Sequence, residues 1–445
     1  MNDLLHVHEE LEAELAAANV VDVHTHLRWH HPHAHSLAEI VFYHFIAAEL
    51  VAAGMPRAVL ELRDERAKLQ AALPFIPLIR CGATHYCLRR ILQDLYGMRE
   101  AYLCEANLDA LCEAVAQTAQ DDNWPRQVLC ERARIRHSFV NVLPSGPRSQ
   151  DSQAGGPDTS RYRDIFIPVL EHGSLIGASP RGLVKTVEQR SGVPVTDAAS
   201  LTAAVTAFLT PAELAHLRAV LAWGAIDMHY GHPDAATVTA AIQKTLAGQP
   251  LVHAERNAVT LWSLHALIAV LQPHQIPFQM FFGSYSAYPA PPVAQYDPQT
   301  LPLLTHLLHE YPAMQFVLFI GSANFVQEAN ILAKMHGNCH VAGIWWHNMY
   351  PAYLRQIIAE RLDVCPLNKV TAYFSDAYMA EWSYGKWCLV RREMAQVLAA
   401  RVVDGYLTRA DAREIIQRWT WDTPRTLYRL EETMNDERRT MNPEP

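Results

Sequence analysis

Val20-Val21-Asp22-Val23-His24-Thr25-His26 decides the fold of this 445-residue chain, because an apolar run here ends in two histidines one residue apart. Side chains alternate between the two faces of a β-strand, so the imidazoles of His24 and His26 share a face and can bind one cation. The stretch therefore predicts a first strand that carries half of a metal site. Parallel α/β barrels place their chemistry at the C-terminal ends of their strands, and the position of the pair favours that architecture.

Chance pairing is the alternative explanation, because the chain contains 23 histidines. A second strand-like pattern far downstream, Val370-Thr371-Ala372-Tyr373-Phe374-Ser375-Asp376, ends in a carboxylate. A first strand with two histidines and a last strand followed by an aspartate form a more specific combination than either one alone. We therefore predict that His24, His26 and Asp376 bind one divalent metal ion, since imidazoles and carboxylates are common zinc ligands.

Strand-like apolar runs recur along the chain, and helical patterns alternate with them, which is typical of a parallel sheet wrapped by helices. The runs after the first lie at 138–143, 164–170, 220–228, 277–282, 314–320, 340–346 and 370–374. The pattern predicts an α/β fold, a (β/α)8 TIM barrel, as a single metal-dependent domain over residues 1–445. Residues 34–118 are largely helical and too long for an ordinary crossover. They predict a helical insertion after the first strand that lies over the barrel mouth.

Charge and composition restrict the partners of the protein. The net charge is −9 and the basic residues are dispersed, which argues against a nucleic-acid partner and favours a small-molecule substrate. The first fifteen residues fit neither a signal peptide nor a spanning helix, so we expect no membrane partner and a cytoplasmic protein. Eight cysteines without a Cys-x-x-Cys pair predict mostly buried free thiols. Tryptophan and methionine are plentiful enough for a homo-oligomer interface, but core packing uses the same residues.

The order of the motifs resembles that of the uronate isomerases in the amidohydrolase superfamily. The resemblance rests on His24-Thr25-His26, on Trp345-Trp346 after a glycine-containing strand, and on Ser375-Asp376 followed by Glu381-Trp382-Ser383-Tyr384-Gly385-Lys386-Trp387. It implies a barrel with one bound divalent cation, for which zinc is expected. It also implies interconversion of an aldose uronic acid and its ketose isomer.

Three departures from the family pattern concern the site itself. The resemblance implies a metal-binding histidine in the strand that here reads Gln279-Met280-Phe281-Phe282-Gly283, so Phe281 stands in the ligand position. An arginine that contacts the substrate carboxylate is replaced by Ala377-Tyr378, and a second arginine by Glu171-His172. A uronate carboxylate would thereby lose two bidentate partners, for which a lysine or hydroxyl is a poor substitute.

A compensating fourth metal ligand is predicted at His229, because it follows an apolar strand and should reach the barrel mouth. The alternative is a loop histidine beside the site, and His347 and Glu171 are weaker ligand candidates. Glu171 is also a candidate for substrate binding. One of Trp345 and Trp346 should line the pocket, because adjacent residues on a strand face opposite sides.

Further candidates follow the first strand. Tyr43-His44 lies on the next predicted helix, where the resemblance implies a His-Tyr pair that reaches the substrate, although the order is reversed here. We take Tyr43 and His44 as catalytic candidates. Arg28 could bind a carboxylate, but a surface ion pair explains it equally well. The remaining helical histidines are predicted to be packing or surface residues: His85, His265, His306 and His309.

Two mechanisms fit these residues. In an isomerase, the metal binds the substrate carbonyl and hydroxyl oxygens, while Asp376 or Tyr43 moves a proton between neighbouring carbons. In a hydrolase, which the wider superfamily makes plausible, Asp376 accepts a proton from metal-activated water. A third possibility is a catalytically inactive barrel with a binding role, which Phe281 supports. We predict a metal-dependent isomerase acting on a sugar acid or a related sugar-like substrate, with hydrolysis as the alternative.

Overall fold

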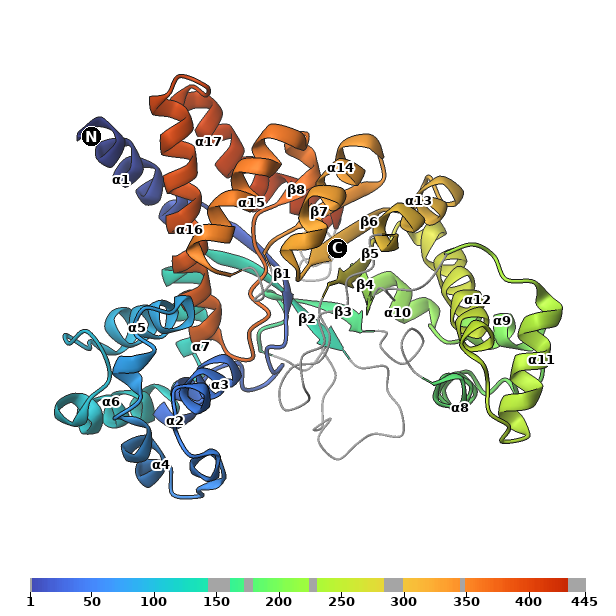
Figure 1. Ribbon diagram of the computed structural model, residues 1–445, viewed down its shortest axis with the longest axis horizontal. Coiled ribbons are helices and arrows are strands. Elements are labelled where there is room, and N and C mark those ends of the chain that lie inside the picture. The colour runs from blue at the N-terminus through green and yellow to red at the C-terminus, as the bar shows by residue number, and fades with distance from the viewer. Residues whose placement is uncertain are drawn as a thin grey trace, which may run out of the picture.

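The computed structural model describes residues 2–142, 161–171, 179–223, 230–283, 299–344 and 349–430. Eight parallel strands form one sheet in the order β1 to β8 (Figure 1). The strands are β1 Val20–Thr25, β2 Ile135–Val142, β3 Phe166–Glu171, β4 Ala219–Trp223, β5 Phe278–Phe282, β6 Phe316–Ile320, β7 Cys339–Ala342 and β8 Val370–Thr371. All eight predicted strands are confirmed, and so is the (β/α)8 barrel.

Backbone hydrogen bonds between β1 and the residues after β8 bring the two ends of the sheet together. The amide of Val23 donates to the carbonyl of Tyr373 at 3.3 Å, and the amide of Asp376 donates to the carbonyl of His24 at 3.0 Å. Regular pairing of β8 ends at Thr371, earlier than the predicted strand end, because the following residues bond to β1 irregularly. The two halves of the predicted metal site therefore become neighbours through the backbone.

The interior of the barrel is a packed apolar core. Inward-facing side chains from alternating strand positions fill it, among them Val23, Phe139, Val169, Phe281 and Phe319. The side-chain amide of Gln279 on β5 donates to the backbone carbonyl of Val23 and to the hydroxyl of Tyr428. Because side chains fill the interior, chemistry is expected in the loops at the C-terminal ends of the strands.

The helical insertion after the first strand is confirmed. Its helices gather on one side of the barrel, at the lower left of Figure 1, and their placement over the barrel mouth stays a prediction. The elements between β1 and β2 are α2 Leu37–Val41, α3 His44–Ala52, η1 Arg57–Glu61, α4 Glu65–Ala72, η2 Ile76–Leu78, α5 Ala83–Tyr96, α6 Glu105–Thr118, α7 Trp124–Arg126 and η3 Gln127–Arg132.

Helix α16, Ala380–Val403, joins this insertion to the barrel. It packs closely on α5 at Gly385, where an added Cβ would lie 2.8 Å from Cγ1 of Ile91 and 2.9 Å from the carbonyl oxygen of Cys87. The buried carboxylate of Glu381 accepts hydrogen bonds from Tyr96 of the insertion and from Trp124, which follows it. The helix that follows the last strand therefore supports both the insertion and the site.

The other helices surround the barrel, and two of them open with capping boxes at Thr210 and Thr408. They are α1 Asn2–Ala17, α8 Pro180–Ser191, α9 Ala198–Thr206, α10 Pro211–His216, α11 Ala235–Leu246, α12 His253–Leu271, η5 Gln272–His274, α13 Thr300–Glu310, η6 Ala323–Phe325, α14 Val326–Met335, α15 Pro351–Val364, η8 Leu367–Lys369, α17 Arg409–Gln417, η9 Arg418–Asp422 and α18 Thr423–Leu427.

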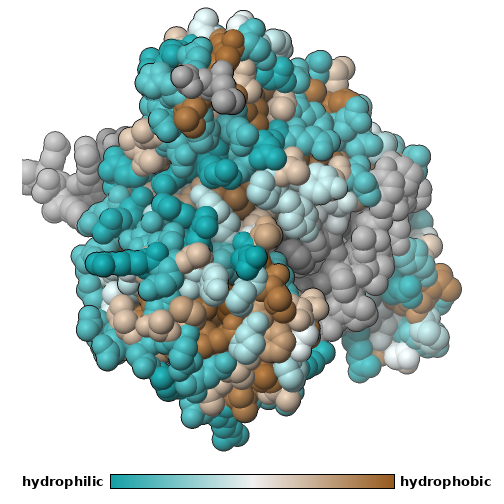
Figure 2. Space-filling model, turned by 60° about the vertical axis from the view of Figure 1, so that its left-hand side comes forward, coloured by the Kyte–Doolittle hydropathy of each residue, from teal (hydrophilic) through white to brown (hydrophobic). Residues whose placement is uncertain are grey.

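The surface of the insertion side is mainly hydrophilic. Figure 2 shows this side, with hydrophobic side chains gathered in the lower half of the view. Leu62 and Leu78 of the insertion are among the exposed large hydrophobic residues. Among the described residues, no helix is long and apolar enough to cross a membrane. All eight cysteines are free thiols, and Cys81 is exposed rather than buried.

Candidate metal centre

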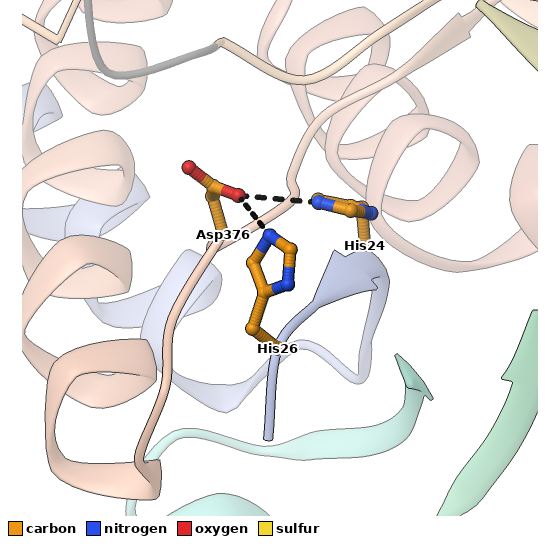
Figure 3. A group of neighbouring side chains, drawn as sticks. All are labelled: His24, His26 and Asp376. Carbon is orange, nitrogen blue, oxygen red and sulfur yellow. Dashed lines mark hydrogen bonds and ion pairs between the residues drawn. The ribbon is translucent and has the colours of Figure 1, made fainter. Parts of the chain in front are cut away.

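His24, His26 and Asp376 meet at the C-terminal end of β1 (Figure 3). His24 is the fifth residue of β1, His26 directly follows the strand, and Asp376 lies five residues after the end of β8. The Nε2 atoms of both histidines lie 3.1 Å from Oδ1 of Asp376. One ligand atom from each residue lies within 4.8 Å of the other two. The structure thus brings together the three residues that the sequence predicts as metal ligands.

The charge state of the cluster suits a divalent cation. Burial lowers the pKa of His24, which favours the neutral imidazole that a metal ion requires. Burial would raise the pKa of Asp376, but hydrogen bonds with His24 and His26 hold it well below its usual value. Two imidazole nitrogens and an ionised carboxylate are a donor set that zinc accepts. The residues present therefore fit a divalent metal ion.

The backbone at Asp376 adopts a conformation that needs support. Its φ is +51°, in the left-handed region that non-glycine residues rarely occupy. The hydroxyl of Tyr43 donates to the carbonyl of Asp376 at 3.1 Å. The ammonium of Lys386 donates to the carbonyl of Ser375 at 2.7 Å and to the hydroxyl of Tyr43 at 3.0 Å. This network holds the carboxylate toward the histidines.

Lys386 is a supporting residue whose role the sequence analysis did not predict. It lies on α16 with 2 % of its surface exposed, and burial lowers the pKa of its ammonium to about 8. Burying an ammonium group costs free energy unless the group is hydrogen-bonded. The two acceptors, Ser375 and Tyr43, provide these hydrogen bonds. The one feature of the sequence that could have indicated this role is the position of the lysine within the aromatic run after Asp376.

Tyr43, a catalytic candidate, has its hydroxyl engaged in this network. Its ring is buried and stacks on Trp382 with centroids 4.2 Å apart. Burial and the charge of Asp376 raise the pKa of Tyr43 well above its usual value, so a phenolate base is disfavoured. The contacts of Tyr43 are those of a residue that positions Asp376.

The floor of the site is aromatic. The ring of Phe281 lies edge-on to His24 with centroids 4.9 Å apart, and Phe319 and Phe374 lie 5.9 Å from the same imidazole. Phe281 on β5 is the residue that stands where the family resemblance implies a histidine ligand. Phe281 therefore makes a ring contact with His24 but has no donor atom that could bind a cation.

A second carboxylate lies beside His26. The Oε2 atom of Glu171, at the end of β3, accepts a hydrogen bond from the amide of Asn141 at 2.8 Å. The same amide lies 3.4 Å from Nδ1 of His26. The charges of Asp376 and Glu171 raise the pKa of His26 against the effect of burial. Asn141 was missed by the sequence analysis, because an asparagine within an apolar strand has no recognisable pattern.

Tyr378 and His44 lie at the edge of the cluster. The ring of Tyr378 stacks on His26 with centroids 5.0 Å apart and an angle of 16°, and 45 % of its surface is exposed. His44 lies 5.4 Å from Tyr378 between ring centroids, and burial and Lys386 lower its pKa to about 3. A neutral imidazole and a phenol ring therefore stand at the solvent side of His26.

Arg28 is the one other predicted site residue that the structure describes. The side chain of Arg28 is exposed in the segment after β1, and its role stays a prediction. His229, Trp345 and Trp346 lie outside the described residues.

Comparisons with known proteins find relatives in structure but not in sequence. No protein-family model and no curated protein sequence matches the chain. A uronate isomerase from Thermotoga maritima matches 95 % of this chain and 97 % of its own, with a TM-score of 0.81 and 15 % identity. A glucuronate isomerase from Caulobacter crescentus matches 96 % and 94 %, with a TM-score of 0.81 and 16 % identity. A uronate isomerase from Bacillus halodurans matches 96 % and 97 %, with a TM-score of 0.76 and 17 % identity. Over almost its whole length, the chain has the fold of these uronate isomerases.

Proposed function

We propose that the protein is a divalent-metal-dependent isomerase that interconverts an aldose sugar acid, or a related sugar-like aldose, with its ketose isomer. The observation that carries the proposal is the cluster of His24, His26 and Asp376. The cluster lies at the C-terminal end of the strands, in a barrel with the fold of uronate isomerases. Fold alone does not determine activity, so the argument depends on what the cluster can do.

The proposed ligands are His24, His26 and Asp376, and zinc is the proposed cation. Three protein ligands leave open positions for substrate, as in other catalytic zinc sites. When bound, the cation would polarise substrate oxygens and make the adjacent C–H bond more acidic. His229 remains the predicted fourth ligand, because Phe281 occupies the position of the family histidine.

Two carboxylates are available for the proton transfer. Asp376 is the proposed base, and the hydrogen bonds from Tyr43 and Lys386 hold its backbone in place. Glu171 is fixed by Asn141 beside His26 and offers a second carboxylate to the same substrate. Isomerisation needs one proton removed from one carbon and one delivered to its neighbour, which a pair of carboxylates can serve.

Substrate recognition should differ from that of an enzyme that binds a uronate through two arginines. Tyr378 stands at one of the two arginine positions and packs on His26, and Glu171 stands at the other. The carboxylate of Glu171 would repel a substrate carboxylate, and the single O–H donor of Tyr378 cannot replace the two parallel hydrogen bonds of an arginine. We therefore expect substrates with a less anionic end to be used at least as well as hexuronates.

The proposal is tested by incubating the metal-loaded protein with a panel of aldohexuronates and neutral aldoses in D₂O. Isomerase activity predicts a ketose product, followed by NMR, with deuterium at the carbon that gains the proton. A proton shielded from solvent would reduce the label but would leave the ketose. Two products formed with consumption of water would instead establish the hydrolase alternative.

Chelation is expected to abolish the activity, and added zinc or another divalent ion should restore it. The reason is that two imidazoles and a carboxylate alone cannot polarise the substrate oxygens as a divalent cation does. Elemental analysis before and after chelation measures the metal content. A protein that neither binds metal at this cluster nor turns over any substrate would be the inactive barrel.

Replacing Lys386 with methionine is expected to weaken metal binding at the cluster by about 10–100-fold, the range seen when residues that orient metal ligands are changed. The substitution keeps much of the side-chain volume but removes the donors to Ser375 and Tyr43. The zinc affinity, measured by titration, and kcat should both decrease. Lys185→Met, at an exposed position of α8, is the matched control. Wild-type zinc affinity in Lys386→Met would show that the ammonium has no positioning role.

A further inference from the structure

A second group of potential metal ligands lies outside the proposed active site. It consists of His232 from the segment after β4, His265 from α12 and Glu310 at the C-terminal end of α13. One ligand atom from each residue lies within 4.8 Å of the other two. In Figure 1, α12 and α13 lie on the right of the barrel, away from α5 and α16. The group shares no residue with the cluster around Asp376.

The contacts within this group converge on one carboxylate. Nε2 of His232 is paired with Oε1 of Glu310, and Nδ1 of His265 lies 3.9 Å from Oε2 of the same residue. The two imidazole rings stack with centroids 3.8 Å apart and an angle of 21°. The hydroxyl of Tyr311 lies 2.8 Å from Nδ1 of His265.

An ordinary ion pair explains only part of this arrangement. Glu310 lies against both imidazoles, whereas an ion pair would need only one of them, and the ring of His265 is stacked beside that pair. Only 4 % of the surface of His265 is exposed, so its imidazole is held in place against His232 and near Glu310. A divalent cation would use both imidazoles and the carboxylate together.

We propose that His232, His265 and Glu310 form a second divalent-cation site, selective for zinc, which fastens the segment after β4 to α12 and α13. Two imidazoles and one carboxylate match the ligands that zinc prefers, and a water would complete the coordination. The three residues come from separate parts of the chain, so a bound cation would link them much as a disulfide would. Because α13 follows β5 and precedes β6, such a link would stabilise one side of the barrel.

The test measures zinc per chain by elemental analysis, after chelation and reloading with zinc alone. Glu310→Gln and His232→Ala are expected to remove one equivalent, both in the wild-type background and in the Asp376→Asn background. His232 and Glu310 are exposed, so neither change should prevent folding, which circular dichroism checks. His253→Ala, at the exposed start of α12, is the matched control and should keep the full zinc content.

The two backgrounds separate this site from the proposed active site. The second site would be established if Asp376→Asn keeps one equivalent of zinc and the double variant Asp376→Asn/Glu310→Gln loses it. This result would hold whether or not the proposed active site binds metal. Added zinc should then raise the Tm of Asp376→Asn but not that of the double variant. Equal zinc content with and without Glu310→Gln, in both backgrounds, would overturn the proposal.

Discussion

Replacement of Asp376 by asparagine is expected to lower kcat/KM by about 10²–10⁴-fold, the range for loss of a positioned acid–base group. One equivalent of bound metal should be lost at the same time. The carboxylate is the shared partner of His24 and His26, each at 3.1 Å, and it carries the negative charge of the cluster. An amide has nearly the same shape but is a neutral and weaker ligand. Initial rates with the best substrate of the panel and elemental analysis of the same samples measure the two effects.

Asp363→Asn is the control for this experiment. Asp363 is a partly exposed carboxylate paired with Arg401, and loss of an exposed ion pair costs at most about 1 kcal/mol. Its activity and metal content should match those of the wild type. Asp376 is both a proposed metal ligand and the proposed catalytic base. Full activity and full metal content in Asp376→Asn would therefore contradict both assignments.

The fold was predictable because the strands of the barrel are short apolar runs separated by capped helices. Strands such as β5 and β6 are buried along their whole length and therefore lack the polar alternation of an exposed strand. The boundaries were less predictable. Residues after Thr371 look like a strand in sequence but bond to β1 irregularly, and the positive φ of Asp376 is supported by contacts of its carbonyl with Tyr43 and Lys386.

The candidate site was predictable only where its chemistry was concentrated in a short motif. His24 and His26 share a strand face, and Asp376 follows the last strand, so the pattern alone places them together. Asn141, Tyr378 and Lys386 each reach the site through one side chain from a different element. Their types are common and their spacing is not periodic, so only the fold reveals what they contact.

The second histidine cluster was even less predictable from sequence, because its three residues belong to no common motif. His265 lies in an apolar helical pattern, and the prediction of a packing residue agrees with its burial in α12. Its neighbours His232 and Glu310 come from the segment after β4 and from another helix. The packing of α12 against its surroundings determines which histidine contacts which carboxylate. The local sequence does not predict this contact.

Replacement of Glu381 by alanine is expected to lower the free energy of unfolding by about 3–5 kcal/mol, because it leaves three buried donors without their acceptor. The carboxylate is fully buried and accepts from the hydroxyl of Tyr96 and the indole of Trp124, each at 3.0 Å. It also accepts from the amide of Ala34 at 3.2 Å. Each buried donor left without an acceptor costs about 1–3 kcal/mol. Urea unfolding followed by circular dichroism and tryptophan fluorescence measures the loss.

Two further variants show whether that loss comes from the network. Glu381→Gln keeps one acceptor oxygen in nearly the same volume, so it should lose less stability than Glu381→Ala. Glu414→Ala removes an exposed partner of Arg418 on α17 and should change stability by less than about 0.5 kcal/mol. Because Glu381 connects the segment after β1, the insertion and α16, its loss should also weaken zinc binding by His26. A stability within about 1 kcal/mol of wild type for Glu381→Ala would mean that packing at Gly385, rather than these hydrogen bonds, holds the insertion to the barrel.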